Sequence, residues 1–273
     1  MPRKLDACPY CNSLQYEVVL EVLNPELDTY SALIGVTFSP PVCYYECSSC
    51  GLTYRNQTFT AVEASALYQS AYRNHILKKN SADEYFNKVI GIPAAESELD
   101  AKISHLNNLI RGKSVRTAVD IGCGVGAFMY KLHASNPEIS VFGIEPTTDF
   151  AIVASSRNDT EVLNKPYDGF DLSGYDLVSC IHVLEHTEQP WTFISALNRN
   201  MRPNAYLYIE TPSTEDIVAL PADHDRFMSP HNYLFSKKFM QARFAETDFA
   251  ILDVGYAGTH RGKVDLRIFA VRK

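Results

Sequence analysis

Three alternate glycines follow a short apolar run and a carboxylate in the stretch Thr-Ala-Val-Asp-Ile-Gly-Cys-Gly-Val-Gly, residues 117–126. This pattern predicts a strand, a tight turn and then a helix. Gly122, Gly124 and Gly126 keep one side of the turn free of Cβ atoms, so a ligand can lie against the backbone there and meet the free N–H groups of the helix N-terminus. We therefore expect a ligand-binding loop at this turn.

Two carboxylates beside the loop indicate which ligand it binds. Glu145 follows the apolar run 141–144, about 20 residues downstream, where an acidic residue commonly accepts hydrogen bonds from a ribose. The glycine spacing alone also satisfies the loose dinucleotide fingerprint. Asp120, two residues before the first glycine, would repel a pyrophosphate and attract the ammonium group of a methionine moiety. The residues therefore favour S-adenosylmethionine (SAM) over NAD.

Four motifs resemble, in order, those of class I SAM-dependent methyltransferases. They are VDIGCGVGAF, GIEPT, YDLVSCIHVLEHTEQP and RPNAYLYIETPS. The resemblance covers residues 116–273 and implies an α/β, Rossmann-like sheet of seven strands that ends in an antiparallel hairpin. One departure is Asn204-Ala205, where the family usually has paired glycines before the fifth strand. This change affects a turn and leaves the chemistry unaffected.

The resemblance also implies a set of residues around the cofactor. Leu67-Tyr68 and Tyr72 resemble a segment that precedes the core in zinc-ribbon methyltransferases, where a tyrosine leans over the cofactor. Aromatic packing between helices is the alternative role for these residues. For the cysteine inside the glycine loop, packing is favoured over reactivity. The residues expected to bind SAM are Asp120, Gly122, Cys123, Gly124, Gly126, Glu145, Pro146, His182 and Tyr72.

Methyl transfer is an in-line displacement, in which the enzyme aligns a nucleophile and removes its proton. A histidine with an ordinary pKa near 6.5 suits the second task. The segment HNYLFS resembles the H-x-x-x-F-S stretch of sugar and small-metabolite methyltransferases, and this makes His231 the first candidate base and His224 the second. Hydrogen bonding to the loop backbone is the alternative for both. His182 is expected to form one wall of the site and is a third candidate for a catalytic residue.

Glu185 and His186 are expected to have a structural role, and for His186 a catalytic role is the alternative. Glu185 and His186 lie just before a helix that should begin near Pro190, and we expect them to cap it.

Four cysteines near the N-terminus have the spacing of a metal site. Cys8-Pro-Tyr-Cys11 and Cys47-Ser-Ser-Cys50 are two knuckles that each present two thiolates, which predicts a structural zinc ribbon. Zinc held by four sulfurs has no open position for water, so its expected role is in folding. Cys43 is expected to be a small buried residue in a strand.

The chain divides into three predicted parts: a β zinc ribbon at 1–60, a helical linker at 61–115 and a methyltransferase domain at 116–273. In the last part, apolar runs alternate with helical segments, as in parallel βαβ units. The long connection 213–235 is expected to be a binding element. Expected strands lie near 117–121, 139–144, 160–163, 175–181 and 205–210, and expected helices near 125–135, 147–157, 190–201 and 236–246.

Composition limits the partners. A net charge of −7 and a pI of about 5.6 argue against a nucleic-acid binder. No run approaches the ~18 apolar residues of a membrane span, so a cytoplasmic protein is expected. The predicted function is methyl transfer from SAM to a hydroxyl of a small polar acceptor such as a sugar or nucleotide-sugar, with transfer to nitrogen or carbon as the alternative. The alternatives are a zinc-ribbon partner-binding protein with a SAM-sensing domain, and an RNA methyltransferase. A homodimer is one option for the assembly.

Overall fold

The computed structural model describes residues 2–24, 28–68, 80–228, 230–259 and 261–273. A seven-stranded sheet forms the centre, with the strand order β12-β13-β10-β9-β6-β7-β8. The strands are β6 (Thr117–Ile121), β7 (Ser140–Ile144), β8 (Val162–Leu163), β9 (Leu177–Ile181), β10 (Tyr206–Pro212), β12 (Phe249–Gly258) and β13 (Val264–Arg272).

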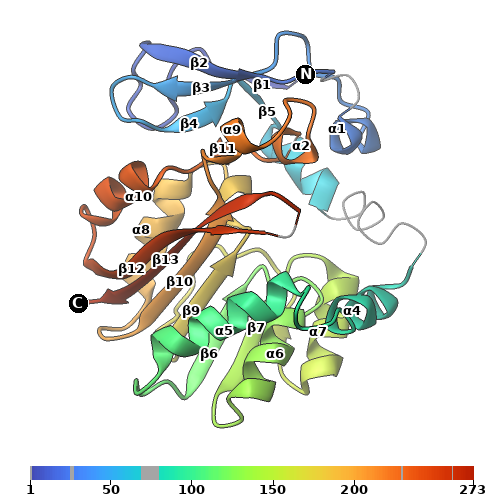
Figure 1. Ribbon diagram of the computed structural model, residues 1–273, viewed down its shortest axis with the longest axis vertical. Coiled ribbons are helices and arrows are strands. Elements are labelled where there is room, and N and C mark those ends of the chain that lie inside the picture. Colours follow the sequence, from blue (N-terminus) through green and yellow to red (C-terminus); the bar gives the residue numbers. More distant parts are fainter. Residues whose placement is uncertain (1, 25–27, 69–79, 229, 260) are drawn as a thin grey trace.

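Strands β6, β7, β8, β9 and β10 are parallel to one another, and β12 and β13 form a hairpin along one edge of the sheet. Strand β13 runs antiparallel to β10, with Ile209 opposite Ile268, and β12 runs antiparallel to β13. Figure 1 shows this hairpin in red. The predicted α/β sheet with a terminal antiparallel hairpin is therefore confirmed.

Helices cover both faces of the sheet because its buried strands are apolar on both sides. On one face, Ala118 packs with side chains of α5 (Glu98–Ile110), α6 (Ala127–Ser135) and α7 (Thr148–Asn158). On the other face, Val119 belongs to the cluster that contains side chains of α8 (Pro190–Asn200) and α10 (Lys237–Phe244). Helix α4 (Ala82–Ile90) packs against α6 and α7.

The N-terminal region forms two small sheets above the ends of β9 and β10 (Figure 1). One pairs β1 (Arg3–Lys4) with β5 (Gln57–Thr58). The other has the order β11-β4-β3-β2, and its strands are β2 (Tyr16–Glu21), β3 (Cys43–Cys47), β4 (Thr53–Arg55) and β11 (Tyr233–Leu234). Two short helices, α1 (Thr29–Leu33) and α2 (Ala61–Ala66), accompany them.

Strand β11 comes from the long connection 213–235, which the sequence predicted as a loop. The connection also contains the short helix α9 (Asp216–Ala219) and the 3-10 turn η4 (Asp225–Phe227). Its β11 runs antiparallel to β4 of the N-terminal region, with Tyr233 opposite Tyr54. The described residues of this connection therefore contribute a strand to the N-terminal sheet.

Among the described residues, no helix combines the length and the apolar character that crossing a membrane requires.

Candidate functional site

The glycine loop between β6 and α6 is open to a ligand at one position. A Cβ atom at Gly124 would meet no atom within 4 Å, whereas a Cβ at Gly122 would lie 2.5 Å from Val183 Cγ2 and one at Gly126 would lie 2.8 Å from Ala154 Cβ. All three glycines have positive φ angles, which L side chains rarely adopt. Gly124 thus clears space for a ligand, while the other two glycines allow close packing of the protein itself. The expectation that all three clear the ligand side is corrected in this respect.

Glu145, at the tip of β7, is bonded to the glycine loop. Its Oε2 accepts a hydrogen bond from the backbone N–H of Gly124 (2.9 Å), and its Oε1 accepts one from the N–H of Thr147 (2.7 Å). Burial raises the pKa of this carboxyl, although both backbone N–H groups oppose the shift. A carboxylate has about four lone-pair sites, so each oxygen can still accept a hydroxyl.

Asp120 and Cys123 lie beneath the loop. The Asp120 carboxylate is 3% exposed and accepts a hydrogen bond from the hydroxyl of Ser179 (2.6 Å). Burial raises the pKa of Asp120 to about 7, and the nearby Glu145 adds to this shift against the opposing effect of the Ser179 bond. Cys123 is buried, and its Sγ would lie 2.8 Å from a Cβ at Gly143, which agrees with the expected packing role.

A cavity opens beside the loop at the carboxyl ends of the parallel strands, where ligands bind in open α/β sheets. Five of the residues expected to bind the cofactor line it: Gly122, Gly124, Glu145, Pro146 and His182. Asp120, Cys123 and Gly126 are not among the lining residues, and Tyr72 lies outside the described residues. Most of the ring-bearing wall of the cavity was not predicted from the sequence; this wall is made by Tyr68, Tyr85, Phe150, Tyr167, His186 and Phe193.

His182, at the end of β9, carries a positive charge between carboxylates. Its Nδ1 lies 3.1 Å from Glu185 Oε1 and its Nε2 lies 3.4 Å from Asp265 Oδ2. Burial and the ammonium of Lys102 oppose protonation, but the hydrogen bonds to Asp265 and Glu185 outweigh them and raise the pKa of His182 to about 9. At neutral pH this side chain is a hydrogen-bond donor, so it is not a proton acceptor.

The cation belongs to a larger buried ionic network. Lys102 of α5 and Arg267 of β13 both pair with Glu210 at the end of β10. Arg226 of η4 pairs with Asp265 (2.5 Å) and with Asp216 (2.6 Å). The carboxylates are Glu185, Glu210, Asp216 and Asp265, and the cations that match them in number are Lys102, His182, Arg226 and Arg267. This balance ties β9, β10 and β13 to the connection 213–235.

Glu185 does not cap helix α8, so that prediction is wrong. The N-cap of α8 is Gln189, and within the described part of the chain its side chain makes no capping hydrogen bond. Glu185 is fully buried instead, and its Oε2 accepts a hydrogen bond from the hydroxyl of Thr211 (3.1 Å). Burial opposes ionisation, but His182 and the neighbouring imidazoles outweigh it and lower the pKa of Glu185 to about 2.

His186, for which a capping role was also expected, faces the cavity instead. Its Nδ1 lies 3.3 Å from the carbonyl oxygen of Pro230. A carbonyl only accepts hydrogen bonds, so the proton of the neutral ring is on Nδ1 and the Nε2 lone pair is free. Burial lowers the pKa of His186, although Glu185, whose Oε1 is 3.9 Å from Nε2, opposes this shift.

The two histidines predicted as bases are placed differently from each other. His231 lies behind His186, with ring centroids 4.9 Å apart, and its Nδ1 is 2.7 Å from the carbonyl oxygen of Arg226. Burial, followed by the charge of His186, lowers the pKa of His231 to about 3. His224 accepts a hydrogen bond from the N–H of Arg226 (3.0 Å), as in the backbone-bonding alternative. Neither histidine is among the residues that line the cavity.

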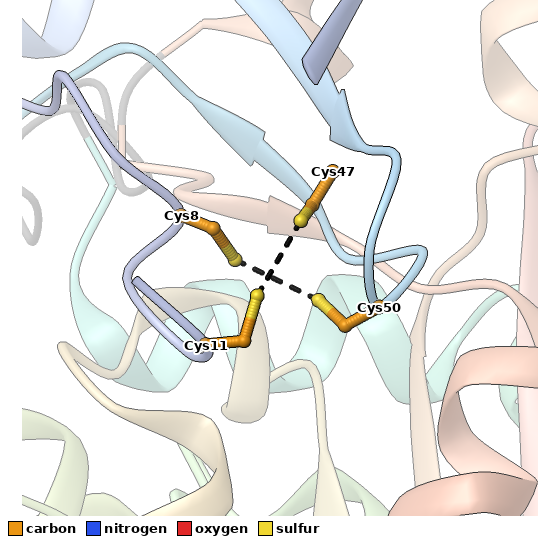
Figure 2. A group of neighbouring side chains, drawn as sticks. All are labelled: Cys8, Cys11, Cys47 and Cys50. Carbon is orange, nitrogen blue, oxygen red and sulfur yellow. Dashed lines mark hydrogen bonds between the residues drawn. The ribbon is translucent and has the colours of Figure 1, made fainter. Parts of the chain in front are cut away.

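The four predicted metal-ligand cysteines converge in the N-terminal region (Figure 2). The Sγ atoms of Cys8 and Cys50 are 3.6 Å apart, and those of Cys11 and Cys47 are 3.5 Å apart. A tetrahedral zinc ion with Zn–S bonds of about 2.3 Å requires sulfur atoms about 3.8 Å apart. The four thiols therefore fit a zinc site, which supports the ribbon prediction.

The two knuckles have the same backbone geometry. The N–H of Asn12 donates to the carbonyl of Cys8, and the N–H of Gly51 donates to the carbonyl of Cys47. Asn12 and Gly51 both have positive φ angles. Each turn thus presents its two thiols from the same conformation, although Asn12 is one of the few non-glycine residues that adopt it.

Comparison with known families gives one match over more than half of the chain. The model of a family described as a methyltransferase domain matches residues 95–254.

Curated relatives match a shorter part. A ubiquinone biosynthesis O-methyltransferase of Nitrosomonas europaea is 28% identical over an alignment of 155 residues, and the match covers 47% of this chain and 64% of that protein. A tRNA U34 carboxymethyltransferase of Pseudoalteromonas translucida is 28% identical over an alignment of 130 residues, and the match covers 44% of this chain and 39% of that protein. The chain thus spans less than two thirds of the length of these relatives.

A solved structure shows the same fold. The magnesium protoporphyrin IX methyltransferase of Synechocystis PCC 6803 with bound SAH superposes with a TM-score of 0.56 and 18% identity. The match covers 78% of this chain and 100% of that protein.

Proposed function

The chain belongs to the methyltransferase domain family, and from this premise we propose that it transfers the methyl group of SAM to a hydroxyl of a small polar acceptor. One observation carries the proposal: the same cavity is lined by Gly124 of the loop, by the Glu145 carboxylate and by two histidines, of which His182 is cationic and His186 is neutral. The first two suit an adenosyl ligand, and the histidines suit an acceptor that must lose a proton.

SAM binding is assigned to the loop side of the cavity. The Glu145 carboxylate accepts the ribose hydroxyls while it holds the N–H of Gly124, and Pro146 forms part of the adjoining wall. Asp120 attracts the methionine ammonium from beneath the loop, and Cys123 and Gly126 maintain the shape of the turn. Tyr72, predicted to lean over the cofactor, keeps that role as a proposal.

Proton removal is assigned to His186, in place of the first-ranked His231. His186 lines the cavity with a free Nε2 lone pair, and Glu185 lies 3.9 Å away to stabilise the proton that it accepts. In the reaction the acceptor oxygen forms a bond to the methyl carbon, the bond from carbon to sulfonium breaks, and the hydroxyl proton goes to Nε2. The products are the methyl ether and neutral S-adenosylhomocysteine (SAH).

Two other histidines have supporting roles in this proposal. His182 lines the cavity as a cation whose two N–H groups are held by Glu185 and Asp265, and its positive charge lies beside the position proposed for the acceptor oxygen. His231 packs against His186 and so fixes the direction of its ring.

Zinc is assigned to Cys8, Cys11, Cys47 and Cys50, whose sulfur spacing fits a tetrahedral ion. With four thiolate ligands the ion would stabilise the fold and leave no position for substrate.

Calorimetry and turnover test the proposal in sequence. Purified protein is titrated with SAM and with SAH, and is then incubated with SAM and a panel of sugars, sugar nucleotides and small phenols while SAH is measured. We expect micromolar binding and SAH formation that depends on one class of acceptor. Absence of heat with both ligands would refute the assignment of the cavity.

Two alternatives would give different results in the same experiment. Binding of SAM without turnover on any acceptor would favour a SAM-sensing partner-binding protein. The relative named for tRNA modification makes RNA the second acceptor to test, and the net charge of −7 predicts that RNA binding at moderate salt is weak.

A further inference from the structure

The segment Pro230–Leu234 lies between the N-terminal sheet and the histidines of the cavity. Toward the cavity, the N–H of Asn232 donates to the carbonyl of Glu185 (2.9 Å), and the carbonyl of Pro230 accepts from His186. Toward the N-terminal region, the carbonyl of Asn232 accepts from the N–H of Arg55 (2.9 Å). One short piece of backbone therefore connects the ribbon to the turn that carries Glu185 and His186.

Tyr44 makes a second connection at the neighbouring residue. Its hydroxyl donates to the carbonyl oxygen of His231 at 2.6 Å, and its side chain is 0% exposed. The ring lies edge-on to Phe227 of η4, with centroids 6.0 Å apart. Tyr44, Phe227 and Leu234 belong to one hydrophobic cluster, so the ribbon and the connection 213–235 share a core.

These contacts hold His231 at two points. Tyr44 fixes its carbonyl oxygen, and the carbonyl of Arg226 fixes its Nδ1. Arg226 is in turn held by its ion pairs with Asp216 and Asp265. The imidazole of His231 is therefore a fixed surface against which the ring of His186 packs at an interplanar angle of 38°.

We propose that Tyr44 is a positioning residue for methyl transfer, which acts through the backbone and ring of His231 on the orientation of His186. This inference rests on the proposed function, because it gives the ribbon a part in orienting the group that takes the acceptor proton. The ribbon then does more than stabilise the chain, because its buried Tyr44 sets the orientation of His186 on the acceptor side of the cavity, which is the side formed by His182 and His186.

The matched control is Tyr45, the next residue of β3. Successive residues of a strand point to opposite faces. The Tyr45 ring stacks on Tyr16 with centroids 4.1 Å apart, and its hydroxyl accepts a hydrogen bond from Asn56. Both tyrosines belong to the ribbon, so Tyr44→Phe and Tyr45→Phe each remove one hydroxyl from the same strand.

The first measurement is the 15N chemical shifts of the imidazole nitrogens, with His186 and His231 assigned from His186→Gln and His231→Gln. We expect Tyr44→Phe to move the signals of both histidines, and Tyr45→Phe to leave them at their wild-type positions. Unchanged signals in Tyr44→Phe, or equal shifts in both variants, would overturn the proposal. These readouts require no acceptor, so they stay informative if the turnover assay fails.

The second measurement uses an acceptor that supports turnover. Tyr44→Phe should lower kcat about tenfold, the size expected for one lost hydrogen bond that holds a reacting group, while KM and the affinity for SAH stay within about twofold. A rise in KM together with a fall in kcat and in zinc content would indicate a merely structural role and contradict the proposal.

His231→Ala provides a test that does not depend on the folding of a Tyr44 variant. It removes the imidazole and keeps the carbonyl to which Tyr44 donates. We expect the 15N signals of His186 to move and kcat to fall in this variant. If His186 is unaffected, His231 does not transmit the orientation and the proposal fails.

Discussion

Replacing Glu145 by alanine tests the cofactor side of the cavity most directly. The carboxylate holds the N–H groups of Gly124 and Thr147 and lines the cavity at the position expected for a ribose. Alanine removes the acceptor for any ribose hydroxyl and also frees the N–H of Gly124. Both effects weaken the binding of any ligand that contains the adenosine group.

The size of the effect follows from the type of bond. A hydrogen bond to a charged group contributes about 1.5–3 kcal/mol, and each 1.4 kcal/mol is about tenfold in affinity. The loss of one such bond predicts a dissociation constant for SAH raised by about 10- to 150-fold. SAM and SAH carry the same ribose, so Glu145→Ala should weaken both by the same factor.

Titration calorimetry measures the dissociation constants of Glu145→Ala for SAH and SAM, and thermal unfolding shows whether the variant is folded. Glu145→Gln retains the shape but places an NH2 group against one of the two backbone N–H groups, so we expect it to lose affinity as well. Glu161→Ala, at an exposed position before β8, is the control and should bind normally. Wild-type affinity in folded Glu145→Ala would show that this carboxylate does not contact the cofactor.

Three further perturbations test other parts of the molecule. His186→Gln should lower turnover by about 10²–10⁴ with SAH affinity retained; a smaller loss of rate would exclude His186 as the base. Removal of zinc by a chelator should lower both the melting temperature and turnover, because β11 pairs with the ribbon strand β4; full activity after verified zinc loss would contradict this coupling. The pKa of His182 is raised to about 9 from an unfolded value near 6.5, so its stabilising contribution is complete below about pH 6.5 and is lost as the pH rises through about 9. The free energy of unfolding of the wild type should therefore decrease between about pH 6.5 and pH 9, and the decrease should be smaller in His182→Gln. Equal decreases in the two proteins would show that the pKa of His182 is not raised in the folded state.

Local patterns were sufficient to predict the sheet and the convergence of the four cysteines. The strand, turn and helix around Gly124 are specified within ten residues of sequence, and so is each pair of cysteines. The terminal hairpin came from the methyltransferase resemblance. In these regions hydrophobic periodicity and glycine spacing describe the same conformation that tertiary packing stabilises.

The acceptor side could not be predicted in this way, because its geometry depends on partners far apart in the chain. Strand β11 has two residues, too few for a periodic pattern, and its partner β4 lies about 180 residues earlier. His186 is oriented by the carbonyl of Pro230, which lies 44 residues later in the chain. The histidine motif indicated His231, yet the direction of each ring depends on contacts that no local pattern encodes.

The charge balance of the ionic network gives a physical reason for the ribbon and the long connection to order together. Arg226 is almost fully buried between Asp216 and Asp265, and an unpaired buried charge would cost several kcal/mol. Arg226 can pair with Asp265 of β13 only when the connection lies against the sheet, and the connection is held there from its other side by β4 and by Tyr44. Loss of the ribbon would therefore expose both the apolar side of Phe227 and the ion pairs beneath it. A substitution in the ribbon can consequently change the acceptor side of the cavity while the glycine loop, which is held by Glu145, keeps its geometry.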